Sequence, residues 1–112
     1  MNELRRRLLE LHKTLVDVER EGYERGRGRM TDGEFLKALI DDPFFAWLAP
    51  LTALIVRLDE LETPDIPADI KPEVKRLLKR DDLGSAFQRR YHEILQKGPD
   101  ALVAHGAVVK QL

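Results

Sequence analysis

Four side chains that can accept, donate or hold a proton fall inside the apolar faces of two expected helices. His12, Glu19 and Tyr23 lie within about 40° of one another on a helical wheel of the N-terminal segment, between two rows of leucine and valine. Asp59 lies among apolar residues of the central segment, where a carboxylate must be paired, hydrogen-bonded or protonated. Brought together, the four groups could form a carboxylate–imidazole site for acid–base chemistry or for a metal ion.

The same four residues also suit a structural role. Metal sites in helical bundles normally use Glu-x-x-His pairs or histidines four residues apart, whereas Val16 stands four residues after His12. A buried polar network can fix the register of two helices, for example with Tyr23 donating to Asp59. We favour this interpretation, and we predict no catalytic residue, no metal site and no cofactor.

Basic side chains form two clusters that could bind phosphate groups. The first occupies a glycine-rich loop and the second an expected helix over 72–79; their members are Arg25, Arg27 and Arg29, and Lys75, Arg76, Lys79 and Arg80. Phosphate contacts need only positive charge and reach. However, no aromatic residues are interleaved for base stacking, and a solvated helix face is the commoner explanation. Nucleic acid is therefore a possible partner that we do not favour.

Composition limits the chemistry further. The chain has 112 residues, no cysteine and a single serine, Ser85, whose surroundings suggest a helix cap. Disulfides, thiolate nucleophiles and cysteine-ligated zinc or iron–sulfur sites are excluded.

His92 and His105 are lone histidines without a ligand-spaced partner, so we do not expect sites there. The charged N-terminus, residues 1–7, lacks the apolar core of a signal peptide, and we expect a cytoplasmic protein without membrane contact.

Charge is unevenly distributed although the net charge is only −1. Residues 31–70 hold 2 basic and 9 acidic side chains, a net charge of −7, whereas residues 71–97 hold 8 basic and 4 acidic ones, a net charge of +4. Such an acidic middle could be balanced within one fold or across a dimer.

The central segment from 43 to 61 is the element on which the others must pack. It contains the only tryptophan and the longest apolar run, which is too short to cross a bilayer. Asp42 is a suitable N-cap, and Thr63-Pro64 ends the helix. Pro50 should kink it, because proline removes a backbone hydrogen bond.

The remaining elements follow from apolar periodicity and capping signals. We predict a long helix from 3 to about 25, a helix after the Thr31–Glu34 capping box, a proline-rich crossover over 63–72, a helix over 72–79, a helix capped by Ser85 and ended by Gly98, and a last helix opened by Pro99. The fold is expected to be all-α, one irregular helical bundle of about five to six helices over residues 1–112, built around the long N-terminal helix and the Pro-kinked central helix.

The first 62 residues, roughly, also resemble a group of small uncharacterised bacterial helical proteins. The resemblance rests on the N-terminal helix around His12 and Glu19, and on the strings Asp42-Pro43-Phe44-Phe45-Ala46-Trp47-Leu48 and Leu54-Ile55-Val56-Arg57-Leu58-Asp59-Glu60. It implies a bacterial, cytoplasmic origin and no particular chemistry.

The function we expect is a non-enzymatic protein-interaction or structural module, whose partner is often a second copy of itself. A strip of small residues, Ala46, Ala49 and Ala53, would permit close approach of another helix, and the apolar stretch 103–112 would need cover from a neighbour. A weak nucleic-acid binder and an enzyme or metal protein are the alternatives.

Overall fold

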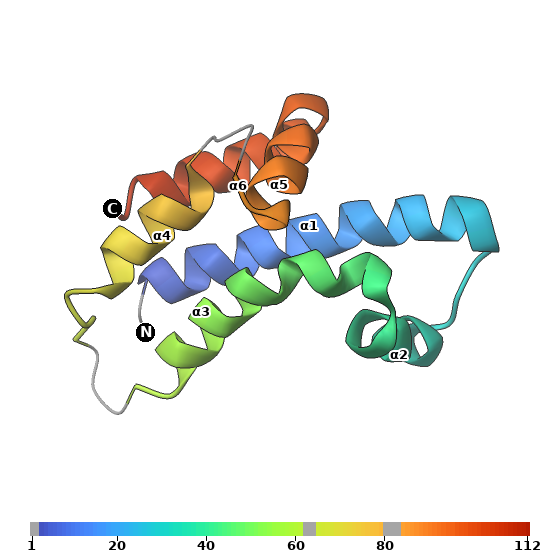
Figure 1. Ribbon diagram of the computed structural model, residues 1–112, viewed down its shortest axis with the longest axis horizontal. Helices are drawn as coiled ribbons and strands as arrows, with labels where there is room; N and C mark the ends of the chain where they lie inside the picture. The colour runs from blue at the N-terminus through green and yellow to red at the C-terminus, as the bar shows by residue number, and fades with distance from the viewer. Residues whose placement is uncertain (1–2, 62–64, 80–83) are drawn as a thin grey trace.

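The computed structural model describes residues 3–61, 65–79 and 84–112, and within these ranges the chain is helical and contains no strand. The elements are α1 Glu3–Arg27, α2 Asp32–Asp41, the 3-10 helix η1 Pro43–Leu48, α3 Ala49–Asp59, α4 Ile70–Leu78, α5 Ala86–Lys97 and α6 Pro99–Val109. Figure 1 shows an irregular bundle arranged along α1. The all-α fold predicted from the sequence is confirmed.

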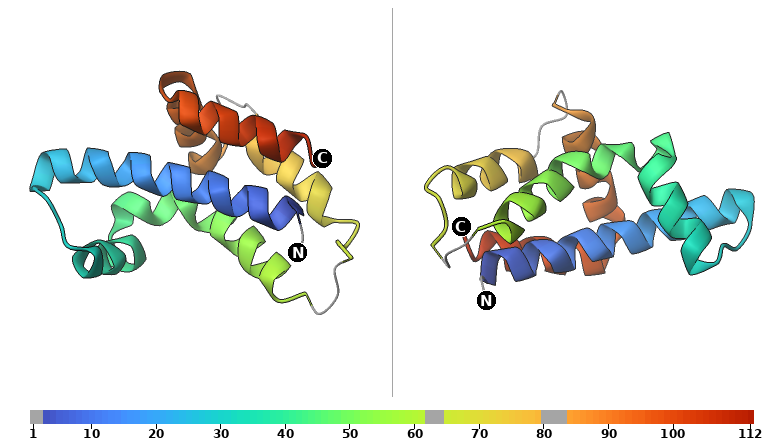
Figure 2. Two further views of the ribbon diagram at one scale, coloured as in Figure 1. Left: turned by 180° about the vertical axis from the view of Figure 1, so that it is seen from behind. Right: turned by 90° about the horizontal axis from the view of Figure 1, so that it is seen from below.

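The first half of α1 forms the centre of the core. Its leucines recur every three or four residues, and the exposed fraction of each is at most 2%: Leu4, Leu8, Leu11 and Leu15. α3 and α6 both pack against α1 (Figures 1 and 2), while α4 and α5 close the bundle between them. This single apolar stripe therefore holds segments from both halves of the chain.

The central segment is broken more sharply than the sequence predicts. Asp42 caps it as expected, accepting a hydrogen bond from the Phe44 N–H at 2.9 Å. Its first part is the 3-10 helix η1, and α3 begins only at Ala49, so that Pro50 lies in the first turn of a new helix. Proline suits that turn because its missing N–H would have no intrahelical partner there.

Helix caps predicted from the sequence are confirmed at two places. Thr31 and Glu34 form the reciprocal capping box of α2, with both hydrogen bonds at 3.2 Å. Ser85 caps α5, and Gln88 completes a second capping box. The local sequence alone determines these ends, because the donor and acceptor lie three residues apart.

α4 and α6 bound the C-terminal part of the bundle. α4 begins at Ile70, two residues before the predicted start at Pro72. The backbone N–H groups of the first helical turn have no intrahelical acceptor, so a proline there costs no hydrogen bond. The predicted last helix forms, and it buries Ala101 and Val108. Residues 63 and 64 of the predicted crossover, and with them the predicted helix end at Thr63-Pro64, lie outside the described residues.

Candidate functional site

The structure does not bring His12, Glu19, Tyr23 and Asp59 into one cluster. Each of the four contacts a different partner. A rise of about 1.5 Å per residue separates His12 from Tyr23 by about 16 Å along α1, although both share one side of it. The expectation of a common polar network is therefore wrong, and the geometry that an acid–base or metal site would need is missing.

Asp59 was expected to be buried, and this expectation is wrong. Its side chain is 55% exposed and forms an ion pair with Arg5 at 2.5 Å. Asp59 is the last residue of α3, and its neighbour on the helical wheel, Val56, is 45% exposed, so this part of the apolar arc lies at the edge of the core. The pair links the start of α1 to the end of α3.

His12 contacts α3 at a second point. Its Nε2 lies 3.1 Å from the Thr52 hydroxyl oxygen, and that hydroxyl donates to the Leu48 carbonyl oxygen at 3.3 Å. With the hydroxyl proton directed at Leu48, the Thr52 oxygen accepts from Nε2 of the imidazole. Desolvation by burial lowers the pKa of His12, which favours the neutral ring. This histidine fixes the register of α1 and α3.

Tyr23 donates to the Asp42 carboxylate at 2.6 Å rather than to Asp59. This hydrogen bond is the main cause that lowers the pKa of Asp42, followed by the bond from the Phe44 N–H. The same bond to Asp42 raises the pKa of Tyr23. The pair joins α1 to the cap of η1, a structural task.

Glu19 is the one charged residue of the described chain that is almost fully buried, with an exposed fraction of 2%. Its carboxylate accepts hydrogen bonds from Trp47 Nε1 at 3.0 Å and from Arg90 at 2.5 Å, so it ties α1 to η1 and α5. The bond to Glu19 is the main cause that raises the pKa of Arg90. A buried carboxylate with two donors is satisfied, and it leaves little capacity for a ligand.

The two basic clusters lie far apart. Arg25 and Arg27 lie in the last turn of α1, where the sequence predicted a loop, and Arg29 follows it at the end that projects beyond the bundle; α4 lies near the other end of α1 (Figure 1). Arg27 packs over the Tyr23 ring, 4.2 Å from its centroid. Arg80 lies outside the described residues. The other members, Lys75, Arg76 and Lys79, therefore form no continuous basic surface with the loop arginines.

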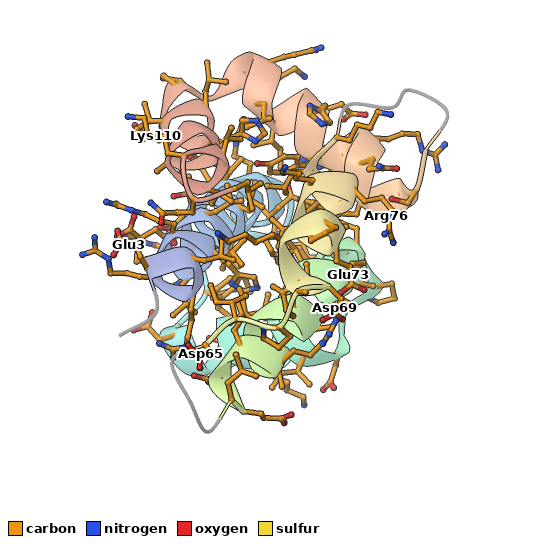
Figure 3. The ribbon with its side chains drawn as sticks, turned by 90° about the vertical axis from the view of Figure 1, so that its left-hand side faces the viewer. Glu3, Asp65, Asp69, Glu73, Arg76 and Lys110 are labelled. Carbon is orange, nitrogen blue, oxygen red and sulfur yellow. The ribbon has the colours of Figure 1, made fainter. Side chains whose placement is uncertain are left out.

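A groove of about 450 Å³ lies between α3 and α4. Arg57 bonds to Asp69 at 2.8 Å and also to Glu73, and both carboxylates raise the pKa of Arg57. Figure 3 shows Glu73 of α4 beside Asp69, the residue that precedes the helix, with Arg76 further along. The two ion pairs of Arg57 hold α4 against α3.

A second groove, which we call the two-histidine groove, lies among α4, α5 and α6 and has a volume of about 580 Å³. Its lining residues are Lys75, Leu78, Lys79, His92, His105, Val109 and Leu112. The two imidazole rings, treated as isolated in the sequence, face each other with centroids 6.4 Å apart. The tight Gly98-Pro99 turn folds α6 back on α5. From this turn one could have predicted that His92 and His105, six or seven positions before and after it, lie close together.

α2 leaves an apolar face in solvent. The exposed fractions are 57% for Leu36 and 73% for Ile40, which lie four residues apart on one side of the helix. Phe35 is the only residue of α2 that is fully buried. The spacing of Phe35, Leu36, Leu39 and Ile40 predicts an apolar face on this helix, but not that the fold leaves much of it in solvent.

Comparison with known proteins adds no relative. No protein-family model matches the sequence, no curated protein matches it, and no solved structure matches its fold. The resemblance to small bacterial helical proteins thus stays a prediction. Among the described residues no single helix is long and apolar enough to cross a membrane; α2 and the segment Pro43–Asp59 meet that test only as a pair bent by 71°.

Proposed function

We propose that this protein is a non-enzymatic interaction module that binds a protein partner, in the first place a second copy of itself, through the outer face of α2. The exposure of Leu36 and Ile40 on a helix that buries only Phe35 carries the proposal. Burial of each of these side chains is worth about 1.5–3 kcal/mol, which the monomer leaves unused. A ten-residue helix is also marginal without tertiary contacts.

The charges beside this face support a contact between two copies. Lys37 and Asp41 lie next to Leu36 and Ile40, both are exposed, and neither forms an ion pair within the described residues. A two-fold axis places the same face on both sides of the interface. Opposite charges at the rim of such a contact then fall within reach of each other, and they favour one orientation.

Further exposed apolar residues would extend the contact surface. Ala46, Ala49 and Ala53 are exposed, as close approach of another helix requires. In the apolar stretch 103–112, Val103 is 74% exposed. The alanine strip and this stretch are the two surfaces predicted from the sequence, and they supplement the face of α2.

The alternatives have weaker support. A nucleic-acid binder would need its basic residues on one surface, and the described members of the two clusters lie at opposite ends. An enzyme or metal protein would need His12, Glu19, Tyr23 and Asp59 around one space. We therefore do not propose either activity.

The test is the molar mass in solution, measured by light scattering across a wide range of concentrations. We expect the mass of a dimer for the natural chain and of a monomer for Leu36→Lys/Ile40→Lys. The control Lys37→Ala/Asp41→Ala changes two exposed residues of the same helix and should weaken the dimer only slightly. A natural chain that stays monomeric would contradict the homodimer, and a lysine variant that still dimerises would contradict α2 as its contact surface.

A monomeric result leads to a second experiment on the same variants. Capture from host lysate should retain one defined protein with the natural chain and with the control variant, in the presence of nuclease. Equal capture by Leu36→Lys/Ile40→Lys would overturn α2 as the contact surface.

A further inference from the structure

The two-histidine groove has the charge of an anion site. Lys75 and Lys79 reach it from α4, His92 from α5 and His105 from α6. No carboxylate side chain belongs to the described lining, and neither lysine forms an ion pair within the described residues. Two ammonium groups would repel a metal cation but attract a carboxylate or phosphate.

The fold holds both imidazole rings in fixed orientations. His92 Nε2 lies 2.9 Å from the Leu78 carbonyl oxygen, which can only accept, so this nitrogen carries the proton. His105 Nδ1 lies 2.6 Å from the hydroxyl of the fully buried Tyr91. The second nitrogen of each ring, Nδ1 of His92 and Nε2 of His105, makes no hydrogen bond within the described part of the chain. Each histidine thus keeps one nitrogen for a ligand.

The groove also offers an apolar wall. Leu78 is buried, Leu112 is half-buried, and Val109 is 48% exposed. A volume of about 580 Å³ falls within the range of about 300–1,000 Å³ that small-molecule sites occupy. A ligand that fits these surroundings combines an anionic head with an apolar body.

We propose that the two-histidine groove binds a small organic anion, a carboxylate or phosphate carried on an apolar chain. Lys75 and Lys79 neutralise the head, and His105 donates to it from Nε2, because its Nδ1 accepts from the Tyr91 hydroxyl. Leu78, Val109 and Leu112 cover the chain. The groove lies on α4, α5 and α6, apart from the face of α2, so this site stands independently of the proposed function.

Calorimetric titration of the full chain with octanoate and with octyl phosphate tests the proposal, with octanol as the neutral probe and inorganic phosphate as the bare head group. We expect at least one amphiphilic anion to bind about tenfold or more tightly than octanol, since its head group makes charge-assisted hydrogen bonds that octanol cannot make. The side-chain nitrogen resonances of His92 and His105 should shift in nuclear magnetic resonance spectra, whereas those of His12 should not.

Two variants with equal loss of charge locate the site. Lys75→Gln/Lys79→Gln should weaken binding of the anionic probe about tenfold or more, whereas Lys71→Gln/Lys97→Gln should leave it within about twofold. All four lysines are exposed, so both variants should fold. Failure of both anions to bind, equal affinity for octanol, or equal weakening by the two variants would overturn the proposal.

Discussion

The two halves of α1 differ in what surrounds them. The first half, with Leu8 and Leu11 completely buried, is enclosed by α3 and α6, and α4 and α5 complete that part of the bundle. The second half projects beyond the bundle, where α2 lies close to its end (Figure 1). There the fold buries Tyr23 and Phe35 but leaves Leu36 and Ile40 in solvent. The difference indicates that the core is concentrated around the first half of α1, while the apolar face of α2 at the other end is the surface that we propose for contact between two copies.

Truncation of one leucine at each end tests this comparison most strongly. Leu11→Ala should lower the free energy of unfolding by about 2–5 kcal/mol, because it removes buried apolar contacts and leaves a cavity. Leu36→Ala should change it by less than about 1 kcal/mol, because the side chain is mostly hydrated already. Urea denaturation at low protein concentration measures both values. Equal losses for the two variants would show that the ends do not differ.

The buried carboxylate gives the next largest effect. Glu19→Gln should cost about 1–3 kcal/mol, because Arg90 loses its buried charged partner and keeps only the exposed Glu93 among the described residues, while Trp47 keeps an acceptor. The matched variant Glu21→Gln changes an exposed glutamate on the same helix and should stay within about 0.5 kcal/mol. Chemical denaturation of both variants and of Arg90→Ala measures how much the Glu19–Arg90 pair contributes to the free energy of unfolding. A loss no larger than that of Glu21→Gln would remove the assigned role of Glu19 in joining α1, η1 and α5.

The two capping boxes allow a smaller and more local comparison. Thr31→Ala and Ser85→Ala each remove one cap, at a cost of about 1 kcal/mol. Because α2 contributes little to the core, Thr31→Ala should increase amide hydrogen exchange in α2 without changing it in the first half of α1. Ser85→Ala affects a helix with four buried residues, Phe87, Tyr91, Ile94 and Leu95, and should lower global stability. The reverse pattern would contradict the assignment of stability to one end.

The smallest expected effects depend on pH. Burial lowers the pKa of His105 below its ordinary value of 6.5, and the nearby His92 lowers it further, so the fold favours the neutral ring. Stability should therefore fall as the pH decreases below 6.5, until the pKa of the folded state is reached. Asp42 acts at lower pH, because the fold depresses its pKa below 3.8. Its ionised carboxylate stabilises the folded protein above pH 3.8, and this stabilisation is lost as the pH falls through the pKa of the folded state.

Unfolding curves recorded at a series of pH values test these two steps. His105→Gln should reduce the step that begins near 6.5, and Tyr23→Phe should reduce the acidic step. A protein that becomes more stable as the pH is lowered from 6.5 would contradict the assignment of His105.

Elements and caps could be predicted from the sequence because their causes are local. The leucine rows of α1 and the capping boxes at Thr31 and Ser85 depend on residues three or four positions apart. Pro50 was recognised as a disruption, but whether it kinks one helix or starts another depends on how Phe45 and Leu48 pack.

Partners of polar side chains could not be predicted in the same way. Glu19 was correctly placed inside the apolar arc, yet its partner Arg90 is 71 positions away and depends on how α5 crosses α1. Asp59 was placed wrongly because a helical wheel gives direction but not depth within the core. His92 and His105 meet only through the turn between α5 and α6, which residue spacing within one helix does not reveal.

Amide hydrogen exchange, recorded at a low and at a high protein concentration, tests the division between the two ends most directly. We predict that the amides of α2 exchange readily when the protein is dilute and become protected when it is concentrated, as the face of Leu36 and Ile40 is covered. The amides around Leu8 and Leu11 should exchange only through global unfolding at either concentration. Strong, concentration-independent protection of α2 would contradict the account, because the monomer would then be complete at both ends.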